Sequence, residues 1–414
     1  MVELMRNVGI IGIGYTPVFV SKRKDVSIAE MISEAVDAGL KNTGLKPEDI
    51  DAYVFGNMAT FEGVNLPHLW AAEHMRAVGK PIMRFATGGT IGMAAFHGAY
   101  YHVASGMADI AMAVTYEKHS EGDAQVGLMG IITPEVMAML ASGIDVTGQS
   151  GMGAIGGGSA GGISFQASSY LHRSGAGIEH IDAIAAMERR NAAKNPYAHL
   201  KDPEATAEKI AQTPMVSWPI RFGHICPTTD GATVCIVASE EKAAKIADKV
   251  AWVLGVANCA SDATTANLIE SQITDPAEQL PAIIASKKAC ERAGIEDPKK
   301  EIDYVEIYNG FAHQTLMYLE KIGMCEVGEA HKLLEAGELE MSGRCPVNAS
   351  GGVVSTNSIG TSALNRVTEC ALQIMGQAGE HQVEKEVHKA MAHGWGGLMQ
   401  YCTITILGDK PKKL

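Results

Sequence analysis

The sequence has no excess of positive charge. Its 414 residues hold 34 Lys and Arg against 47 Asp and Glu, which gives a net charge of −13. Nucleic acid and anionic membrane surfaces attract basic proteins, so neither is expected as a partner. No stretch reaches the roughly 18 apolar residues of a membrane-spanning helix, and the first residues lack the pattern of a signal peptide. The sequence therefore predicts a soluble, cytoplasmic protein.

The eight cysteines lack paired spacing. They lie between Cys226 and Cys402 and never form a CxxC pair, so zinc-ribbon and redox-motif interpretations fail and no metal site is expected. HExxH, P-loop and EF-hand motifs are also missing. Gly12-Ile13-Gly14 hints at a dinucleotide fingerprint, but Pro17 stands at the position of the third glycine. No cofactor is expected from these motifs.

Glycine, in contrast, is abundant, with 45 residues, well above the roughly 7% usual for globular chains. Twelve of them fall between Gly122 and Gly162. A segment of this kind is either a linker or a cover over a functional pocket, and we favour a mobile cover.

Two stretches of the chain repeat one pattern. Residues 37–57 end an amphipathic helix, turn through a glycine and enter a strand, and residues 287–310 do the same, with Ile50 aligned to Ile302 and Asn57 to Asn309. One such match can arise by chance, but a glycine turn, a long helix and a buried strand follow in both copies. We interpret the pattern as a duplication.

The continuous apolar strands predict an α/β fold with sheets covered by helices on both faces. The two halves would pack as a five-layered αβαβα body. Residues 1–120 and 163–255 are expected to form the N-terminal half, 121–162 the glycine-rich covering loop, and 256–414 the C-terminal half.

Three motifs resemble the thiolase superfamily, and the resemblance covers essentially the full length. Cys226–Ala232 reads CPTTDGA and resembles the CPTSDGA stretch of sterol-carrier-type thiolases. Pro346–Gly352 reads PVNASGG and resembles their PVNPSGG, and Ala392–Gly397 falls where they carry a histidine–glycine loop. The resemblance implies the duplicated thiolase fold, with coenzyme A as a substrate.

The catalytic positions depart from the family. Thiolases place a nucleophilic cysteine at a helix N-terminus, where the backbone dipole favours the thiolate, and the matching residue here is Phe85. The His-Asp-Cys-Phe motif of the family corresponds to residues 308–311, which read YNGF, and its Gly-His-Pro motif to residues 356–358, which read TNS. Of the family's catalytic residue types, only the histidine is present, as His393.

The replacements suggest a chemistry without that cysteine. His393 and Asn357 are candidates for stabilising an enolate oxygen. Tyr308 is the candidate acid or base, provided that its surroundings lower its pKa. Cys226 and Cys345 are the possible substitute thiols because they lie beside family motifs.

A substrate pocket is expected around these residues. Phe85 would form a wall suited to an aromatic acyl group. The residues predicted to line this pocket are Phe85, Ser358 and Asn348.

This pattern resembles thiolase-like subunits that work with a small separate protein carrying a zinc ribbon and an OB-fold. They include steroid side-chain aldolases and the large subunit of benzoylsuccinyl-CoA thiolase. The first hypothesis is an acyltransferase subunit that acts on a bulky, aromatic β-ketoacyl-CoA in anaerobic aromatic degradation. The second is a retro-aldolase acting on a β-hydroxyacyl-CoA, and the third is a non-catalytic scaffold. The resemblance implies a homodimer with two small partner chains.

Overall fold

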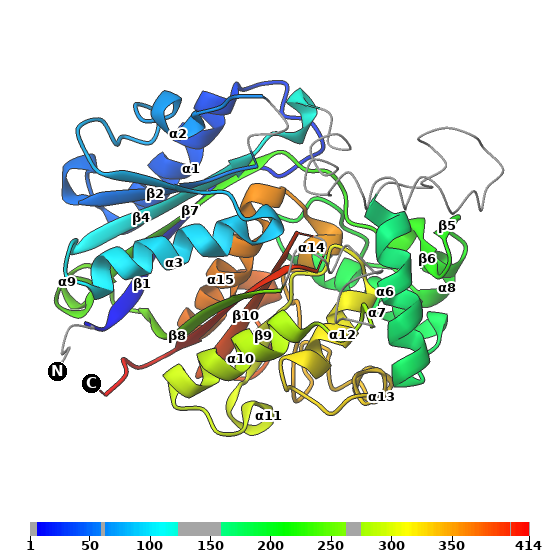
Figure 1. Ribbon diagram of the computed structural model, residues 1–414. Helices are drawn as coiled ribbons and strands as arrows, with labels where there is room; N and C mark the ends of the chain where they lie inside the picture. The colour runs from blue at the N-terminus through cyan, green and yellow to red at the C-terminus, as the bar shows by residue number, and fades with distance from the viewer. Residues whose placement is uncertain (1–5, 59–62, 123–158, 262–274, 398, 414) are drawn as a thin grey trace.

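The computed structural model describes residues 6–58, 63–122, 159–261, 275–397 and 399–413. Within these ranges nine strands form one mixed sheet (Figure 1). The first half of the sheet contains, in spatial order, β3 (Ile82–Phe85), β2 (Ala52–Gly56), β4 (Ile110–Glu117), β7 (Gly231–Ser239) and β1 (Val8–Tyr15). The second half continues with β8 (Ala251–Ala260), β11 (Tyr401–Gly408), β10 (Lys389–Gly396) and β9 (Tyr304–Glu306).

The two halves of the sheet have the same topology, which confirms the duplication. Strand β2 runs parallel to β4, which is antiparallel to β7, and β9 runs parallel to β10, which is antiparallel to β11. Both β2 and β9 begin two residues after the aligned Ile50 and Ile302. The halves meet where β1 pairs with β8 through Gly9–Trp252 and Ile10–Ala251.

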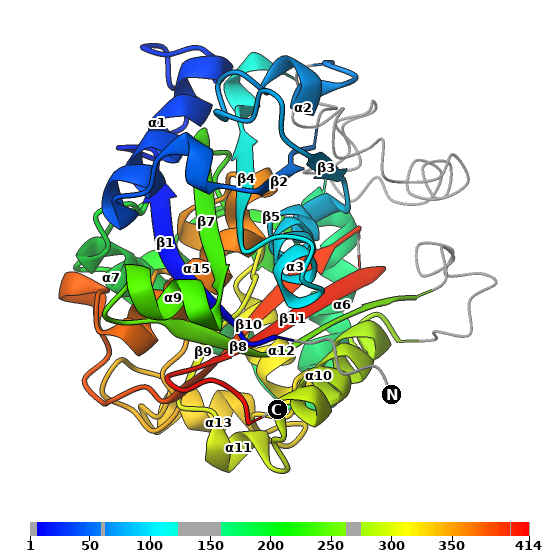
Figure 2. The same ribbon diagram turned by 90° about the vertical axis from the view of Figure 1, so that its left-hand side faces the viewer.

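Helices form three layers, and the two halves of the sheet form the two layers between them (Figure 2). The predicted five-layered arrangement is therefore confirmed. The outer face of the first half is covered by α1 (Ile28–Thr43) and α9 (Glu240–Ile246). The central layer contains α3 (Ile91–Ala104) and α15 (Ile359–Met375), and the outer face of the second half is covered by α10 (Leu280–Ala293) and α12 (His313–Lys321).

Local sequence explains the ends and faces of these helices. The α1 helix starts at a capping box of Ser27 and Glu30 and ends at Gly44, whose φ of 69° favours glycine. The α3 helix is apolar on nearly all sides because it lies between the two halves of the sheet. It approaches α15 at Gly92, where an added methyl group would lie 2.9 Å from Cβ of Leu364.

The remaining elements pack mostly beside the second half of the sheet. They are α6 (Ser159–Ser174), α7 (Ile178–Lys194), α8 (Ala207–Ala211), β5 (Met215–Ser217), β6 (Ile220–Arg221), α11 (Pro298–Glu301), α13 (Ala330–Glu335) and α14 (Gly352–Ser355), with α2 (Pro67–Trp70) on the first half. Most of the predicted covering loop lies outside the described residues. The proposed domain boundary at 255/256 falls within β8. Among the helices described, none is long and apolar enough to span a membrane.

Candidate active site

The structure brings Tyr308, Asn357 and Cys226 together. The hydroxyl of Tyr308 lies 3.5 Å from Oδ1 of Asn357, a long hydrogen bond, and the Asn357 amide donates through Nδ2 to the sulfur of Cys226 at 3.2 Å. The hydroxyl of Ser362 donates to the same Asn357 Oδ1 at 2.9 Å. These contacts fix the orientation of the Asn357 amide, with its oxygen toward the two hydroxyls and its nitrogen toward the thiol.

Backbone contacts between separate elements hold these side chains in place. Tyr308 follows β9, and its N–H donates to the carbonyl of His393 in β10 at 3.1 Å. Asn357 lies in the turn between α14 and α15, where its carbonyl accepts from the N–H of Thr229 and its N–H donates to the Thr229 hydroxyl. The N–H of Cys226 donates to the carbonyl of Gly310. The site is therefore assembled at the junction of both halves.

The hydroxyl of Tyr308 lies over the turn that precedes α3. A methyl group built on Gly89 would lie 2.9 Å from this hydroxyl oxygen, so a larger residue does not fit there. Gly89 belongs to the short helical turn that leads into α3, where the helix dipole is positive. The ring of Phe85 lies instead against Gly98 of α3. The tyrosine hydroxyl, and not the side chain at position 85, thus faces the start of the helix.

Burial controls the protonation of these groups. It raises the pKa of Tyr308 well above its usual value, although the Ser362 hydrogen bond and the charge of Arg366 act in the opposite direction. The condition that the surroundings lower this pKa is therefore not met, and the phenol is neutral at physiological pH. Burial also raises the pKa of the Cys226 thiol to about 11. A thiol in this state is a weak nucleophile.

The side chain of His393 is not part of this group. Its imidazole packs against Tyr318 of α12, with ring centroids 4.1 Å apart. It is fully buried, and neither ring nitrogen has a hydrogen-bond partner among the described residues. Burial lowers its pKa to about 3, so the ring is neutral.

Three other predicted residues are engaged elsewhere. Asn348 donates through Nδ2 to Glu188 at 2.7 Å and accepts through Oδ1 from the N–H of Ile307. The hydroxyl of Ser358 lies 3.1 Å from the carbonyl of Gly231. Cys345 is buried in the hydrophobic cluster on the α12 side, and burial raises its pKa to about 11. The first two side chains therefore serve the packing of this region, and the third lies apart from the Tyr308 group.

Sequence reasoning missed a set of polar residues on one face of α15. Ser362 contacts Asn357, and Arg366, one turn later, donates through Nε to the carbonyl of Ser362 and forms a buried ion pair with Glu306. The i, i+4 spacing of these residues in a predicted helix was the available signal. Trp395 was also missed, although its ring centroid lies 6.0 Å from that of Tyr308.

No cluster of His, Cys, Asp and Glu suited to a metal ion occurs in the part of the chain that the structure describes. The chemistry that can be assigned to the site is that of the Tyr308 hydroxyl, the Asn357 amide and the Cys226 thiol. A neutral phenol can donate a proton, and an amide N–H can stabilise negative charge on oxygen.

Comparison with known proteins identifies the family. Residues 8–209 match the thiolase N-terminal domain, and residues 261–409 match the thiolase C-terminal domain-like family. The chain therefore belongs to the thiolase superfamily.

Relatives span nearly the whole chain. An acetyl-CoA acetyltransferase of Methanocaldococcus jannaschii is 27% identical over 98% of this chain and 100% of its own length. The benzoylsuccinyl-CoA thiolase subunit BbsB of Thauera aromatica is 27% identical over 95% of this chain and 96% of its own. The solved structure of the Ltp2–ChsH2 (DUF35) aldolase matches with a TM-score of 0.81 and 23% identity, covering 99% of this chain and 100% of that one. The last likeness shows the shared fold.

Proposed function

We propose that this chain is the large subunit of a thiolase-like enzyme that forms or breaks a carbon–carbon bond in a bulky β-ketoacyl-CoA without an acyl-cysteine intermediate. The observation that carries the proposal is the position of the Tyr308 hydroxyl over Gly89, at the start of α3. The family resemblance aligns the thiolase nucleophile with Phe85, at the end of β3 and four residues before Gly89. Here a buried, neutral phenol with Asn357 beside it faces the start of α3 instead.

The proposed cleavage starts with attack of the coenzyme A thiolate on the β-keto carbon. The tetrahedral intermediate collapses, the bond between the α- and β-carbons breaks, and the electron pair remains on the enolate of the shorter acyl-CoA. Tyr308 gives its proton to the α-carbon of this enolate, and the resulting phenolate is reprotonated by the thiol of the next coenzyme A. The second N–H of Asn357 is the proposed donor to the enolate oxygen.

An aromatic acyl group is the proposed substrate class. Trp395 places an indole ring near Tyr308, and aromatic rings pack favourably against one another. The relationship to a benzoylsuccinyl-CoA thiolase subunit supports the same class.

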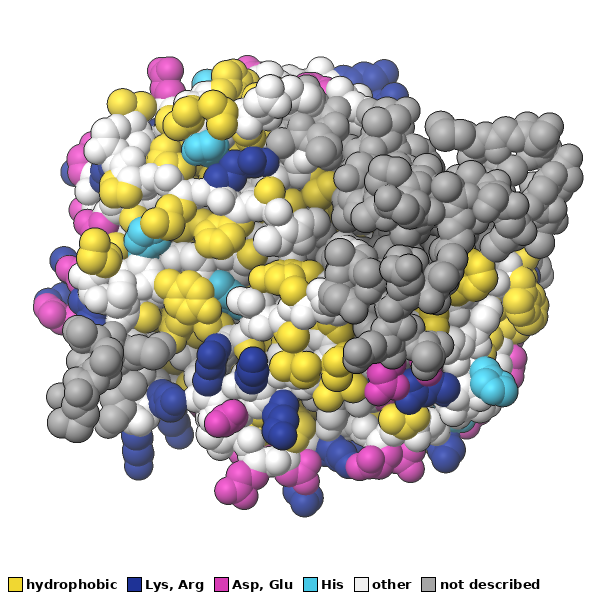
Figure 3. Space-filling view, viewed as in Figure 1, with side chains coloured by type: hydrophobic (Ala, Val, Ile, Leu, Met, Phe, Trp, Pro, Cys, Tyr) yellow, Lys and Arg dark blue, Asp and Glu magenta, His cyan; other side chains and the backbone are white. Residues whose placement is uncertain are grey.

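We extend the proposal to the assembly. The aldolase with the similar fold contains a DUF35 partner, which supports a small zinc-ribbon and OB-fold subunit here. A homodimer through β3 is supported by the apolar surface near this edge strand, where apolar side chains gather on the face that carries α2 and α3 (Figure 3). Leu69, Met83 and Tyr101 are 60%, 53% and 45% exposed, and apolar patches of this kind mark interfaces.

Retro-aldol cleavage of a β-hydroxyacyl-CoA is the second candidate, supported by the fold shared with an aldolase. It requires Tyr308 to act as a base, and the raised pKa of the phenol disfavours that role. A non-catalytic scaffold is the remaining alternative.

The test uses the chain together with its small partner subunit. Benzoylsuccinyl-CoA with free coenzyme A, and separately a β-hydroxyacyl-CoA, are supplied as substrates, and the products are measured by mass spectrometry. Formation of two acyl-CoA products from the first substrate supports the proposal. Release of an aldehyde or ketone from the second supports the aldolase, and inactivity with both supports the scaffold.

A further inference from the structure

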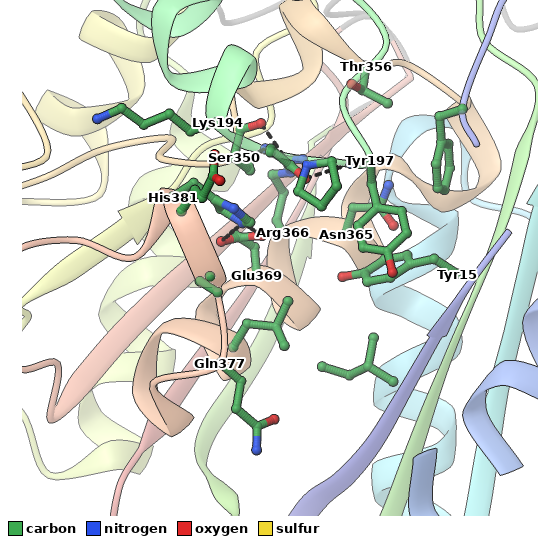
Figure 4. A pocket seen from close by; sticks show the side chains of 18 of the residues that line it. Tyr15, Lys194, Tyr197, Ser350, Thr356, Asn365, Arg366, Glu369, Gln377 and His381 are labelled. Carbon is green, nitrogen blue, oxygen red and sulfur yellow. Dashed lines mark hydrogen bonds and ion pairs between the residues drawn. The ribbon is translucent and has the colours of Figure 1, made fainter. Parts of the chain in front are cut away.

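A cavity lies apart from the Tyr308 group, between the end of β1, the segment that follows α7, and the C-terminal part of α15 (Figure 4). Its volume is about 530 Å³, within the range of roughly 300–1,000 Å³ that is usual for small-molecule sites. Tyr15, Tyr197, Arg366 and Glu369 are among the residues that line it, whereas Tyr308, Asn357 and Cys226 are not. The proposed reaction therefore gives this cavity no role.

One wall of the cavity is aromatic. The rings of Tyr15 and Tyr197 lie 4.6 Å apart at an angle of 37°, and Phe19 meets Tyr15 edge to face at 6.2 Å. Tyr197 is 37% exposed, and its hydroxyl has no hydrogen-bond partner within the described ranges. An aromatic face that is accessible from a cavity favours a planar ring as the ligand.

Two buried carboxylates, one lining the cavity and one beneath it, are engaged by the protein. Glu369 accepts hydrogen bonds from His381 and Gln373 and forms an ion pair with His381. Glu306, beneath the cavity, accepts from the Tyr304 hydroxyl and pairs with Arg366. Each acid is matched by a cation, so neither ion pair gives the cavity a net charge.

The Nη2 group of Arg366 is not used in the hydrogen bonds between described residues. Its Nε donates to the carbonyl of Ser362 at 3.3 Å, and its Nη1 donates to the hydroxyl of Ser350 at 2.8 Å and to Glu306. Its Nη2 makes no hydrogen bond to any described residue. The side chain is only 3% exposed, but Nη2 is not among the fully buried atoms that lack a partner. The cavity therefore reaches this N–H group, which water or a ligand can accept from. The floor of the cavity thus offers a donor to an acceptor that the described protein does not supply.

We propose that this cavity binds a small, neutral, planar aromatic compound with a carbonyl oxygen, such as an aryl amide. The ring lies on Tyr197, and the carbonyl oxygen accepts a hydrogen bond from Nη2 of Arg366. The two buried ion pairs cancel, and Lys194 and Glu380, which also line the cavity, carry opposite charges. A neutral ligand fits better than an anion because the cavity has no net attraction for negative charge.

Binding of benzamide to the full-length protein tests the proposal by isothermal titration calorimetry. Saturable binding with a dissociation constant below about 5 mM is expected for a ligand of this size. Cyclohexanecarboxamide, which keeps the amide and loses the aromatic face, is expected to bind at least tenfold more weakly, and benzoate no more tightly than benzamide.

Two variants locate the site. Tyr197→Ala changes a partly exposed side chain and is expected to weaken benzamide binding at least tenfold, whereas Tyr308→Phe leaves it unchanged. Arg366→Lys is expected to weaken benzamide binding as much as Tyr197→Ala does. If Arg366→Lys does not fold, Tyr197→Ala alone tests the site. Absence of saturable binding means that the cavity holds only water and overturns the proposal. Binding that survives Tyr197→Ala, or is lost in Tyr308→Phe, overturns it as well.

Discussion

The side-chain amide of Asn357 joins the hydroxyl of Tyr308 to the thiol of Cys226, with its oxygen 3.5 Å from the first and its nitrogen 3.2 Å from the second. Cys226 follows a short helical turn, Tyr308 follows β9, and Asn357 precedes α15, so these residues come from three separate parts of the chain. The proposed chemistry depends on this arrangement.

Tyr308→Phe removes the hydroxyl and keeps the ring in its packing against Trp395. Turnover is expected to fall at least tenfold. A positioned acid contributes roughly a hundredfold or more, so the loss should approach that value. Initial rates measured with the partner subunit give kcat. Tyr53→Phe, which removes a buried hydroxyl that donates to the carbonyl of Arg76 away from the site, is the control. An unchanged rate would remove Tyr308 from the mechanism.

Cys226→Ser is expected to keep turnover within about threefold. The pKa of the thiol is raised to about 11, so at neutral pH it carries almost no thiolate that could attack a thioester. Mass spectrometry of the wild-type protein quenched during turnover should show no acyl group on residue 226. Detection of such an adduct, together with inactivity of the serine variant, would restore the acyl-enzyme mechanism.

Ser362→Ala removes the hydroxyl that donates to Asn357 Oδ1. The amide keeps its contacts with Tyr308 and Cys226 but loses its shortest hydrogen bond. We therefore expect kcat to fall about three- to tenfold while KM changes little, since one neutral hydrogen bond contributes about 1 kcal/mol. Ser286→Ala is a matched control because its buried hydroxyl donates to the carbonyl of Ile322, away from the site. Equal losses of kcat in the two variants would assign Ser362 a purely structural role.

His393→Phe is expected to keep turnover within a few-fold, because the imidazole packs on Tyr318 and away from the Tyr308 group. Burial lowers the pKa of His393 to about 3, so the folded protein resists protonation that the unfolded chain accepts. This lowers the wild-type stability as pH falls below about 6.5, the ordinary histidine pKa. Urea unfolding at pH 7.5 and 5 should show a smaller loss in the variant. A large loss of kcat would return His393 to the catalytic group.

Glu188 gives the stability a pH dependence of the opposite sign. This buried acid accepts from Thr315, Asn348 and Asn309, and burial raises its pKa to about 7. A carboxyl whose pKa is higher in the folded state stabilises the protein below its unfolded pKa of about 4.3, and this stabilisation is lost as pH rises to 7. The free energy of unfolding of Glu188→Gln and of the wild type is measured at pH 5 and 7.5. The change between the two pH values should be smaller in the variant. Identical pH dependence would contradict this assignment.

The sequence was sufficient for the fold but not for the site. The repeat anchored by Ile50 and Ile302 predicted two equivalent strands, and β2 and β9 begin where the alignment places them. Tyr308 and Asn357 meet, as their motifs suggested. The alternation of side chains along a strand decides on which face His393 lies, and a motif match alone does not determine that face. The protonation of Tyr308 depends on its burial by several elements that are distant in the sequence. A sequence motif therefore does not predict it.

The pairing of β1 with β8 makes one continuous sheet out of two duplicated units. Gly89 belongs to the first unit and Tyr308 to the second, so a fragment that contains either unit alone cannot place the hydroxyl over this turn. Twisting one unit against the other would break backbone pairs at the seam and slide α3 along α15, which meet closely at Gly92. The tyrosine hydroxyl is thus held at a fixed height above its glycine by the stiffness of the entire body.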